Sequence, residues 1–142
     1  MKLINKVIFV ILTVVMYGCG SSAPPTDSNA QLPQDIVMET YRLILSGDYA
    51  GAQENFSDEY IEEFVTSRNK TFKEYADGPT EGWKPEWLKT KLMGNKYNRD
   101  VWRVKIIPDE GKGANNGPGI VHDLHIIDGR WKIVFWGHYP KT

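Results

Sequence analysis

The stretch HDLHIIDGRWKIVF, His122 to Phe135, most strongly predicts local structure in this chain. Asp128-Gly129 stands between two runs of strand-forming residues and is typical of a two-residue hairpin turn. With that turn, the pairs on one face of the hairpin are Ile126 with Trp131, Leu124 with Ile133, and His122 with Phe135. This face is the more apolar one, so we expect it to meet the rest of the core, with His122 pointing inward.

The opposite face of the hairpin is predicted to carry the pairs His125 with Lys132, Asp123 with Val134, and Val121 with Trp136. His122 and His125 are three residues apart in a strand, so their imidazoles project to opposite faces and cannot converge on one ion. We therefore expect no metal site here. Asp123 and His125 share the outer face, where a solvated surface pair is favoured over a catalytic dyad.

A further strand is predicted before this hairpin. In Val101 to Ile107, the apolar residues Trp102, Val104 and Ile106 alternate with basic ones, which indicates one buried face. The connection that follows, Asp109 to Gly119, is rich in glycine. Its lysine precedes the glycine run and no Lys-Ser/Thr pair opens a helix after it, so a hairpin loop is favoured over a phosphate-binding loop.

Helical spacing dominates the chain before Gly78. A first helix is predicted from Pro33 to a stop at Gly47, a second begins after Asp48, and a third is capped by Ser57. The third is expected to run on to Ala76–Pro79, with a buried stripe of Ile61, Phe64, Val65, Phe72 and Tyr75. Together with the strands, this pattern predicts an α+β domain in which N-terminal helices pack on a curved antiparallel sheet. Trp83 and Trp87, in GWKPEW, are expected to cover one end of the core, although exposed indoles could also stack on a ligand.

The first residues predict export. Lys2 and Lys6 precede an apolar run, Val7 to Val15, that is too short to span a bilayer and has the length of a signal-peptide core. Met16-Tyr17-Gly18-Cys19 resembles the bacterial lipobox, which implies a signal peptide over residues 1–18 and lipidation of Cys19. The alternative is an ordinary signal peptide with a chance cysteine, but Cys19 is the only cysteine and cannot form an internal disulfide.

The residues after Cys19 bear on location. Gly20 and Ser21 follow the cysteine, and the resemblance to enterobacterial lipoproteins implies delivery to the periplasmic face of the outer membrane when aspartate is absent there. Residues 19–32 have the small, polar and proline-bearing composition of a flexible linker, and residues 33–142 have the size of one domain. Removing Lys2 and Lys6 leaves 15 basic against 18 acidic side chains, a balance that does not favour nucleic acid.

Two motifs carry a family resemblance. Val37-x-x-x-Tyr41 with LSGDYAGA, Leu45 to Ala52, lies in the helical half, and DGRWKIV, Asp128 to Val134, in the closing hairpin. Over Pro33 to His138 the chain resembles the nuclear transport factor 2-like superfamily, also called the cystatin-like α+β cone, and within it small bacterial lipoproteins. The superfamily includes ketosteroid isomerase, scytalone dehydratase, polyketide cyclases and many domains without catalysis, so the resemblance implies a fold and leaves the function open.

Two functions follow as hypotheses. The first is a membrane-anchored envelope lipoprotein with a non-enzymatic domain that binds a small molecule or an envelope protein, without a cofactor, and that can form a homodimer through its sheet face. Its expected ligand-contacting residues are His122, Tyr41, Trp102 and Phe135. The alternative is a small isomerase-, dehydratase- or hydrolase-like enzyme with His122 as the interior acid/base group. A water-accessible cavity at His122 would favour the enzyme, whereas a filled cone would favour binding at the surface.

Overall fold

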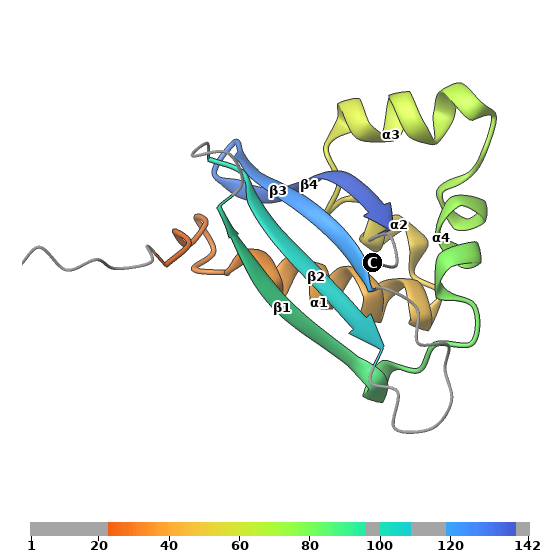
Figure 1. Cartoon of the computed structure of the whole chain (residues 1–142). Coiled ribbons are helices and arrows are strands. Elements are labelled where there is room, and N and C mark those ends of the chain that lie inside the picture. The colour runs from red at the N-terminus through yellow and green to blue at the C-terminus, as the bar shows by residue number, and fades with distance from the viewer. Residues whose placement is uncertain (1–22, 96–99, 109–118, 139–142) are drawn as a thin grey trace, which may run out of the picture.

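The computed structural model describes residues 23–95, 100–108 and 119–138, and it has the predicted α+β architecture (Figure 1). The helices are α1 (Pro33–Ser46), α2 (Tyr49–Gln53), α3 (Asp58–Phe64) and α4 (Phe72–Thr80), with short 3₁₀ turns η1 (Thr66–Arg68) and η2 (Pro85–Trp87). They are followed by strands β1 (Leu88–Asn95), β2 (Trp102–Pro108), β3 (Ile120–Ile127) and β4 (Arg130–His138). The strands form one antiparallel sheet in the order β1-β2-β3-β4.

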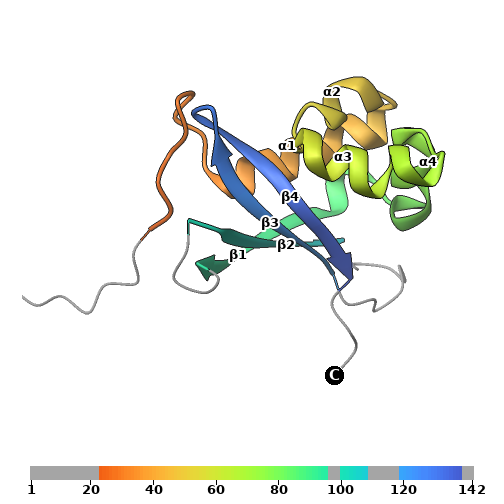
Figure 2. The same ribbon diagram turned by 90° about the horizontal axis from the view of Figure 1, so that it is seen from above.

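The helices cover one face of the curved sheet. α1 lies along that face, and α2, α3 and α4 gather at the end of the molecule opposite the β3–β4 turn (Figures 1 and 2). α1 begins with Pro33 in its first turn and ends at Gly47, whose φ of 86° is the left-handed conformation that glycine adopts without cost. Its buried side chains recur at helical spacing, so the predicted first helix is confirmed.

The third predicted helix is wrong as a single element. Ser57 caps α3 as expected, by accepting a hydrogen bond from the Tyr60 amide at 3.2 Å, but the helix stops at Phe64. Asn69 has a left-handed φ of 53°, and Thr71 then caps a separate helix in a capping box with Glu74. The apolar stripe is therefore divided between α3 and α4. The Thr71-x-x-Glu74 pattern is the sequence signal of the second start.

The prediction of β2 is confirmed, whereas β1 carries no clear strand signal. Trp102, Val104 and Ile106 are buried on β2, as their alternation predicts. In β1 the inward residues are Leu88, Thr90 and Leu92, alternating with exposed lysines. Because only one of these three is fully buried, the alternation is too weakly apolar to stand out in the sequence.

The β3–β4 hairpin has the predicted turn and, near the turn, the predicted register. Asp128 and Gly129 have φ values of 49° and 75°, as a type I′ turn requires. The pairs Ile126 with Trp131, His125 with Lys132, and Leu124 with Ile133 are confirmed. Leu124 and Ile133 are fully buried, while Ile126, close to the turn, is 36% exposed because the hairpin extends beyond the core there.

Beyond Leu124 the predicted register is wrong. A β-bulge shifts the pairing between Asp123 and Leu124, so that Asp123 pairs with Phe135, His122 with Trp136 and Val121 with Gly137. The extra residue on β4 reverses which side chains face inward from there on. Trp136 is consequently buried at 7% exposure, and Phe135, expected opposite His122 in the core, is 40% exposed on the outer face.

Candidate functional site

Tyr41 on α1 and His122 on β3 form a buried polar pair inside the cone. The Tyr41 hydroxyl lies 3.0 Å from His122 Nε2, and the two residues are 0% exposed. Tyr41 faces the sheet because it belongs to the apolar stripe of α1, and His122 faces inward because it alternates with Leu124 on β3. The sequence thus predicted two members of the candidate site that the fold brings together.

Burial controls the electrostatics of this pair. It lowers the pKa of His122 to about 3, because the imidazolium would have to leave water. Burial likewise raises the pKa of the Tyr41 hydroxyl well above its usual value. His122 Nδ1 has no hydrogen bond of good geometry to any described residue, although the backbone of Phe135 is close enough to favour the charged form. Both groups are therefore neutral near pH 7, and Nε2 accepts a hydrogen bond from the Tyr41 hydroxyl when the imidazole proton is on Nδ1.

Aromatic rings fill the space around the pair. Trp83 stacks on Tyr41 with ring centroids 5.5 Å apart, and Trp136 lies 5.7 Å from Tyr41 and 5.3 Å from His122. Phe56, Tyr60 and Tyr75 continue the cluster behind Trp136. Trp83 is half-buried and covers the end of the core, which is one of its two expected positions. The cluster leaves His122 without access to solvent.

The other two expected ligand-contacting residues lie elsewhere. Trp102 is 5% exposed near the start of β2, where it pairs with Leu124, and it lines a separate hollow of about 460 Å³ together with Trp131 and His125. Phe135 stands on the outer sheet face, with its ring over Gly137. The bulge in β4 is the reason that Phe135 does not join Tyr41 and His122.

Asp123 is held by Arg103 across the outer face of the sheet. Arg103 Nε and Nη2 donate to the two carboxylate oxygens at 2.6 and 2.8 Å, which is a bidentate ion pair. Asp123 is only 6% exposed, and its neighbour His125 is half-buried. The expected solvated setting of Asp123 is therefore wrong, because Arg103 and Asp123 are register partners on β2 and β3 and form this ion pair.

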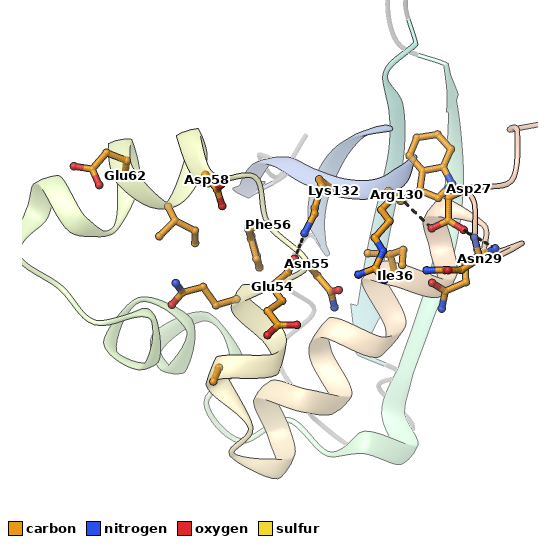
Figure 3. Close-up of a pocket in the computed structure, with 15 residues that line it drawn as sticks. Asp27, Asn29, Ile36, Glu54, Asn55, Phe56, Asp58, Glu62, Arg130 and Lys132 are labelled. Atoms are coloured by element: carbon orange, nitrogen blue, oxygen red, sulfur yellow. Dashed lines mark hydrogen bonds between the residues drawn. The ribbon is translucent and has the colours of Figure 1, made fainter. Parts of the chain in front are cut away.

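An open polar groove of about 720 Å³ lies between the helices and β4 (Figure 3). Its helical wall carries the carboxylates of Glu54, Asp58 and Glu62, and its strand wall carries Arg130 and Lys132. The Lys132 ammonium donates to the carbonyl of Glu54, and this contact joins the two walls. The groove was not predicted, because its residues come from separate elements and share no spacing in the sequence.

Backbone hydrogen bonds hold the groove in shape. The Ile133 amide donates to the Asn55 carbonyl at 2.8 Å, and the Ser57 amide donates to the Ile133 carbonyl at 2.9 Å. Asn55 Nδ2 also donates to Thr40 Oγ1 of α1 at 2.9 Å. The α2–α3 connection is thus fixed to both β4 and α1, so the groove is preformed.

Asp27 closes the groove at the end near the β3–β4 turn. Its carboxylate accepts from the amides of Asn29 at 2.8 Å, Gln31 at 3.0 Å and Trp131 at 3.4 Å. The Ser28 amide donates to the Gly129 carbonyl at 2.7 Å. Residues 27–31, which composition assigned to the linker, therefore pack on the hairpin.

Among the described residues, no three His, Cys, Asp or Glu side chains are placed to hold a metal ion. No helix of residues 23–95, 100–108 and 119–138 is long and apolar enough to cross a membrane. The predicted signal peptide and lipidation site, Cys19, and most of the glycine-rich loop, residues 109–118, lie outside the described residues.

Comparison with known proteins leaves the chain without an assigned family. No protein-family model matches it, and neither a curated protein nor a solved structure matches it. The resemblance to the nuclear transport factor 2-like superfamily rests on the two local motifs and stays a prediction.

Proposed function

We propose that this protein is a lipid-anchored lipoprotein of the bacterial cell envelope whose folded body is a non-enzymatic binding domain. The observation that supports the non-enzymatic binding domain is the filled interior of the cone. Tyr41 and His122 are 0% exposed there, whereas the polar groove is open to solvent. A binding surface needs access, and on this body access is found at the groove.

The chemistry of the groove supports a polar ligand. One wall is acidic and the other basic, and side-chain amides lie between them. Such a surface complements a ligand that carries both charges, for example an extended peptide segment of an envelope protein. The anchor itself is supported by the sequence of the first 22 residues, above all by Gly18-Cys19 after a short apolar run.

The enzyme alternative has one observation in its favour, the convergence of two polar groups in the interior. A general acid or base must come within hydrogen-bond reach of its substrate. The aromatic cluster fills the space that a substrate would need beside His122, so we place binding ahead of catalysis.

Acyl labelling of cells that express the wild type and Cys19→Ala tests the anchor. We expect labelled fatty acid on the wild type and membrane partitioning that Cys19→Ala abolishes, with unchanged circular dichroism of the body. Membrane partitioning without any acyl group on the wild type would rule out the lipoprotein.

A thermal-shift screen of peptides and small polar molecules tests the binding domain. The reversal Glu62→Lys on the exposed groove wall should abolish a stabilising hit, while Glu39→Lys on the exposed side of α1 should keep it. A hit that is lost only when His122 is replaced would favour the enzyme instead.

A further inference from the structure

The hydrogen bonds of Asp27 bear on how the body is held at a membrane. Asp27 bonds to Trp131 and its neighbour Ser28 bonds to Gly129. The chain is thereby attached at Asp27–Ser28 to the end of the molecule that contains the β3–β4 turn. We call this end the turn pole and define it as residues 27–30 and 126–130. Figures 1 and 2 both show the segment before α1 beside the β3–β4 turn.

The chain between the anchor and the turn pole is short. Cys19 and Asp27 are eight residues apart, and a fully extended chain spans at most about 3.5 Å per residue, or about 28 Å in total. Pro24-Pro25 within this stretch favours extended backbone and restricts folding back. A lipid on Cys19 therefore lies within about 28 Å of Asp27 in the turn pole.

We infer, resting on the lipid anchor proposed above, that the turn pole faces the phospholipid bilayer and the helical end with α3 points away from it. A tether attached at one end of a body restricts which end approaches the surface. The sheet is about 27 Å long, from the eight residues of β3 at about 3.4 Å per residue, so the distal end can meet the surface only if the tether is almost fully extended, which costs chain entropy.

The distribution of charge agrees with this orientation. The exposed part of the turn pole has Asp128 and Arg130, whose charges cancel, and the apolar Ile126 at 36% exposure. The exposed side chains of α3 include Asp58, Glu59, Glu62 and Glu63. An anionic bilayer repels this acidic helix and does not repel the turn pole.

Two single-cysteine variants measure the orientation in the processed, full-length lipoprotein. Acylation consumes the thiol of Cys19, so a fluorophore attaches only to the introduced cysteine, in Asp128→Cys at the turn pole or Glu86→Cys just before β1 at the distal end. The protein is bound to vesicles of phosphatidylethanolamine and phosphatidylglycerol that carry a headgroup energy acceptor. We expect stronger energy transfer from position 128 than from position 86.

Asp27→Ala, added to each labelled variant, removes the three carboxylate hydrogen bonds and so loosens the attachment of the chain to the turn pole, where the Ser28–Gly129 backbone bond remains. It should bring the two transfer efficiencies closer together. Asn29→Ala is the matched control, because only the backbone amide of Asn29 bonds to Asp27. Circular dichroism shows whether each variant is folded.

The outcomes separate the two proposals. Equal transfer from positions 128 and 86 in an acylated protein overturns the orientation and leaves the lipoprotein standing. A difference that is undiminished in folded Asp27→Ala also overturns the inference, because the attachment of the tether would then not cause it. Mass spectrometry of the same preparation reads the acyl group on Cys19, and its absence overturns the anchor together with the orientation.

Discussion

At the scale of single residues, burial strongly lowers the pKa of His122. Its imidazole lies among Tyr41, Trp136 and Leu124 rather than in water, and its Nε2 is hydrogen-bonded to the neutral hydroxyl of Tyr41. In the unfolded chain the same imidazole titrates near pH 6.5. The difference links folding to pH.

We expect acid to destabilise the protein through His122. Its pKa falls from 6.5 to about 3 on folding, so below about pH 6.5 the unfolded state binds a proton that the folded state does not. The stability contribution is complete above the unfolded pKa and is lost as pH falls toward the folded pKa, at a rate of about 1.4 kcal/mol per pH unit. Urea unfolding of the wild type and His122→Gln between about pH 7 and about pH 5 measures it.

The control for this experiment is His125→Gln, on the outer face of the same strand. His122→Gln should flatten the slope against pH more than His125→Gln does, because His122 is fully buried whereas His125 is half-buried. An identical slope in the wild type and His122→Gln would contradict the burial of a neutral imidazole.

The hydroxyl of Tyr41 is expected to stabilise the fold through the same pair. Tyr41→Phe leaves Nε2 of His122 buried without its donor, which should cost about 1–3 kcal/mol in the free energy of unfolding. Tyr49→Phe is the control, because its hydroxyl bonds to Asp77 in a half-buried position at the surface. A loss no larger in Tyr41→Phe than in Tyr49→Phe would mean that the interior hydrogen bond does not form.

At the scale of elements, the bulge in β4 decides which aromatic residue belongs to the core. Without it, two-residue alternation from the turn would place Phe135 inward and Trp136 outward. With it, the Trp136 ring contacts four rings of the aromatic cluster, those of Tyr41, Phe56, Tyr75 and His122. The Trp136 carbonyl also accepts a hydrogen bond from the Tyr60 hydroxyl at 3.5 Å. The two registers make opposite predictions for a pair of neighbouring substitutions.

Trp136→Ala should therefore be far more destabilising than Phe135→Ala. Truncating a buried tryptophan costs about 3–5 kcal/mol through lost burial and a cavity, whereas truncation on an exposed face costs about 1 kcal/mol or less. Chemical denaturation of both variants gives the comparison. The reverse order would restore the regular register and return Phe135 to the interior beside His122.

At the scale of the whole molecule, the folded body begins before the helices do. Composition places the start of the domain at residue 33, whereas the hydrogen bonds of Asp27 and Ser28 extend the packed chain to residue 27. The Trp131 amide donates to Asp27, and the backbone of Ile133 is hydrogen-bonded to Asn55 and Ser57. The outer edge of β4 is therefore covered from Trp131 to Ile133. A covered edge does not offer a strand to another chain.

Comparing chains that begin at Ala23 and at Pro33 tests this boundary. Removing residues 23–32 deletes the carboxylate that satisfies the Trp131 amide, and we expect the free energy of unfolding to fall by about 1–3 kcal/mol. Urea denaturation with fluorescence detection reports the change. Equal stability of the two chains would show that the domain starts at residue 33, as composition alone indicates.

The sequence by itself determined the elements whose signals are local. Asp128-Gly129 has the residues for two positive φ values, Gly47 ends α1, and Ser57 starts α3, because caps and turns depend on neighbouring residues. The same holds for the inward faces of α1 and β2, since burial of a stripe follows from periodicity. Tyr41 and His122 were accordingly predicted to lie in the interior.

Only the tertiary structure decided which of these residues meet. The β4 bulge inserts one residue and reverses every face beyond it, and no local signal in Ile133–Phe135 demands that insertion. Packing decides it, because Trp136 then meets rings from α1, α4, β3 and the α2–α3 connection. The groove is formed by side chains from α2, α3 and β4, and the turn pole by contacts between residues 27–28 and 129–131, all far apart in sequence. Such contacts depend on how the elements stack, because non-local packing and hydrogen bonding leave no periodic pattern along the chain.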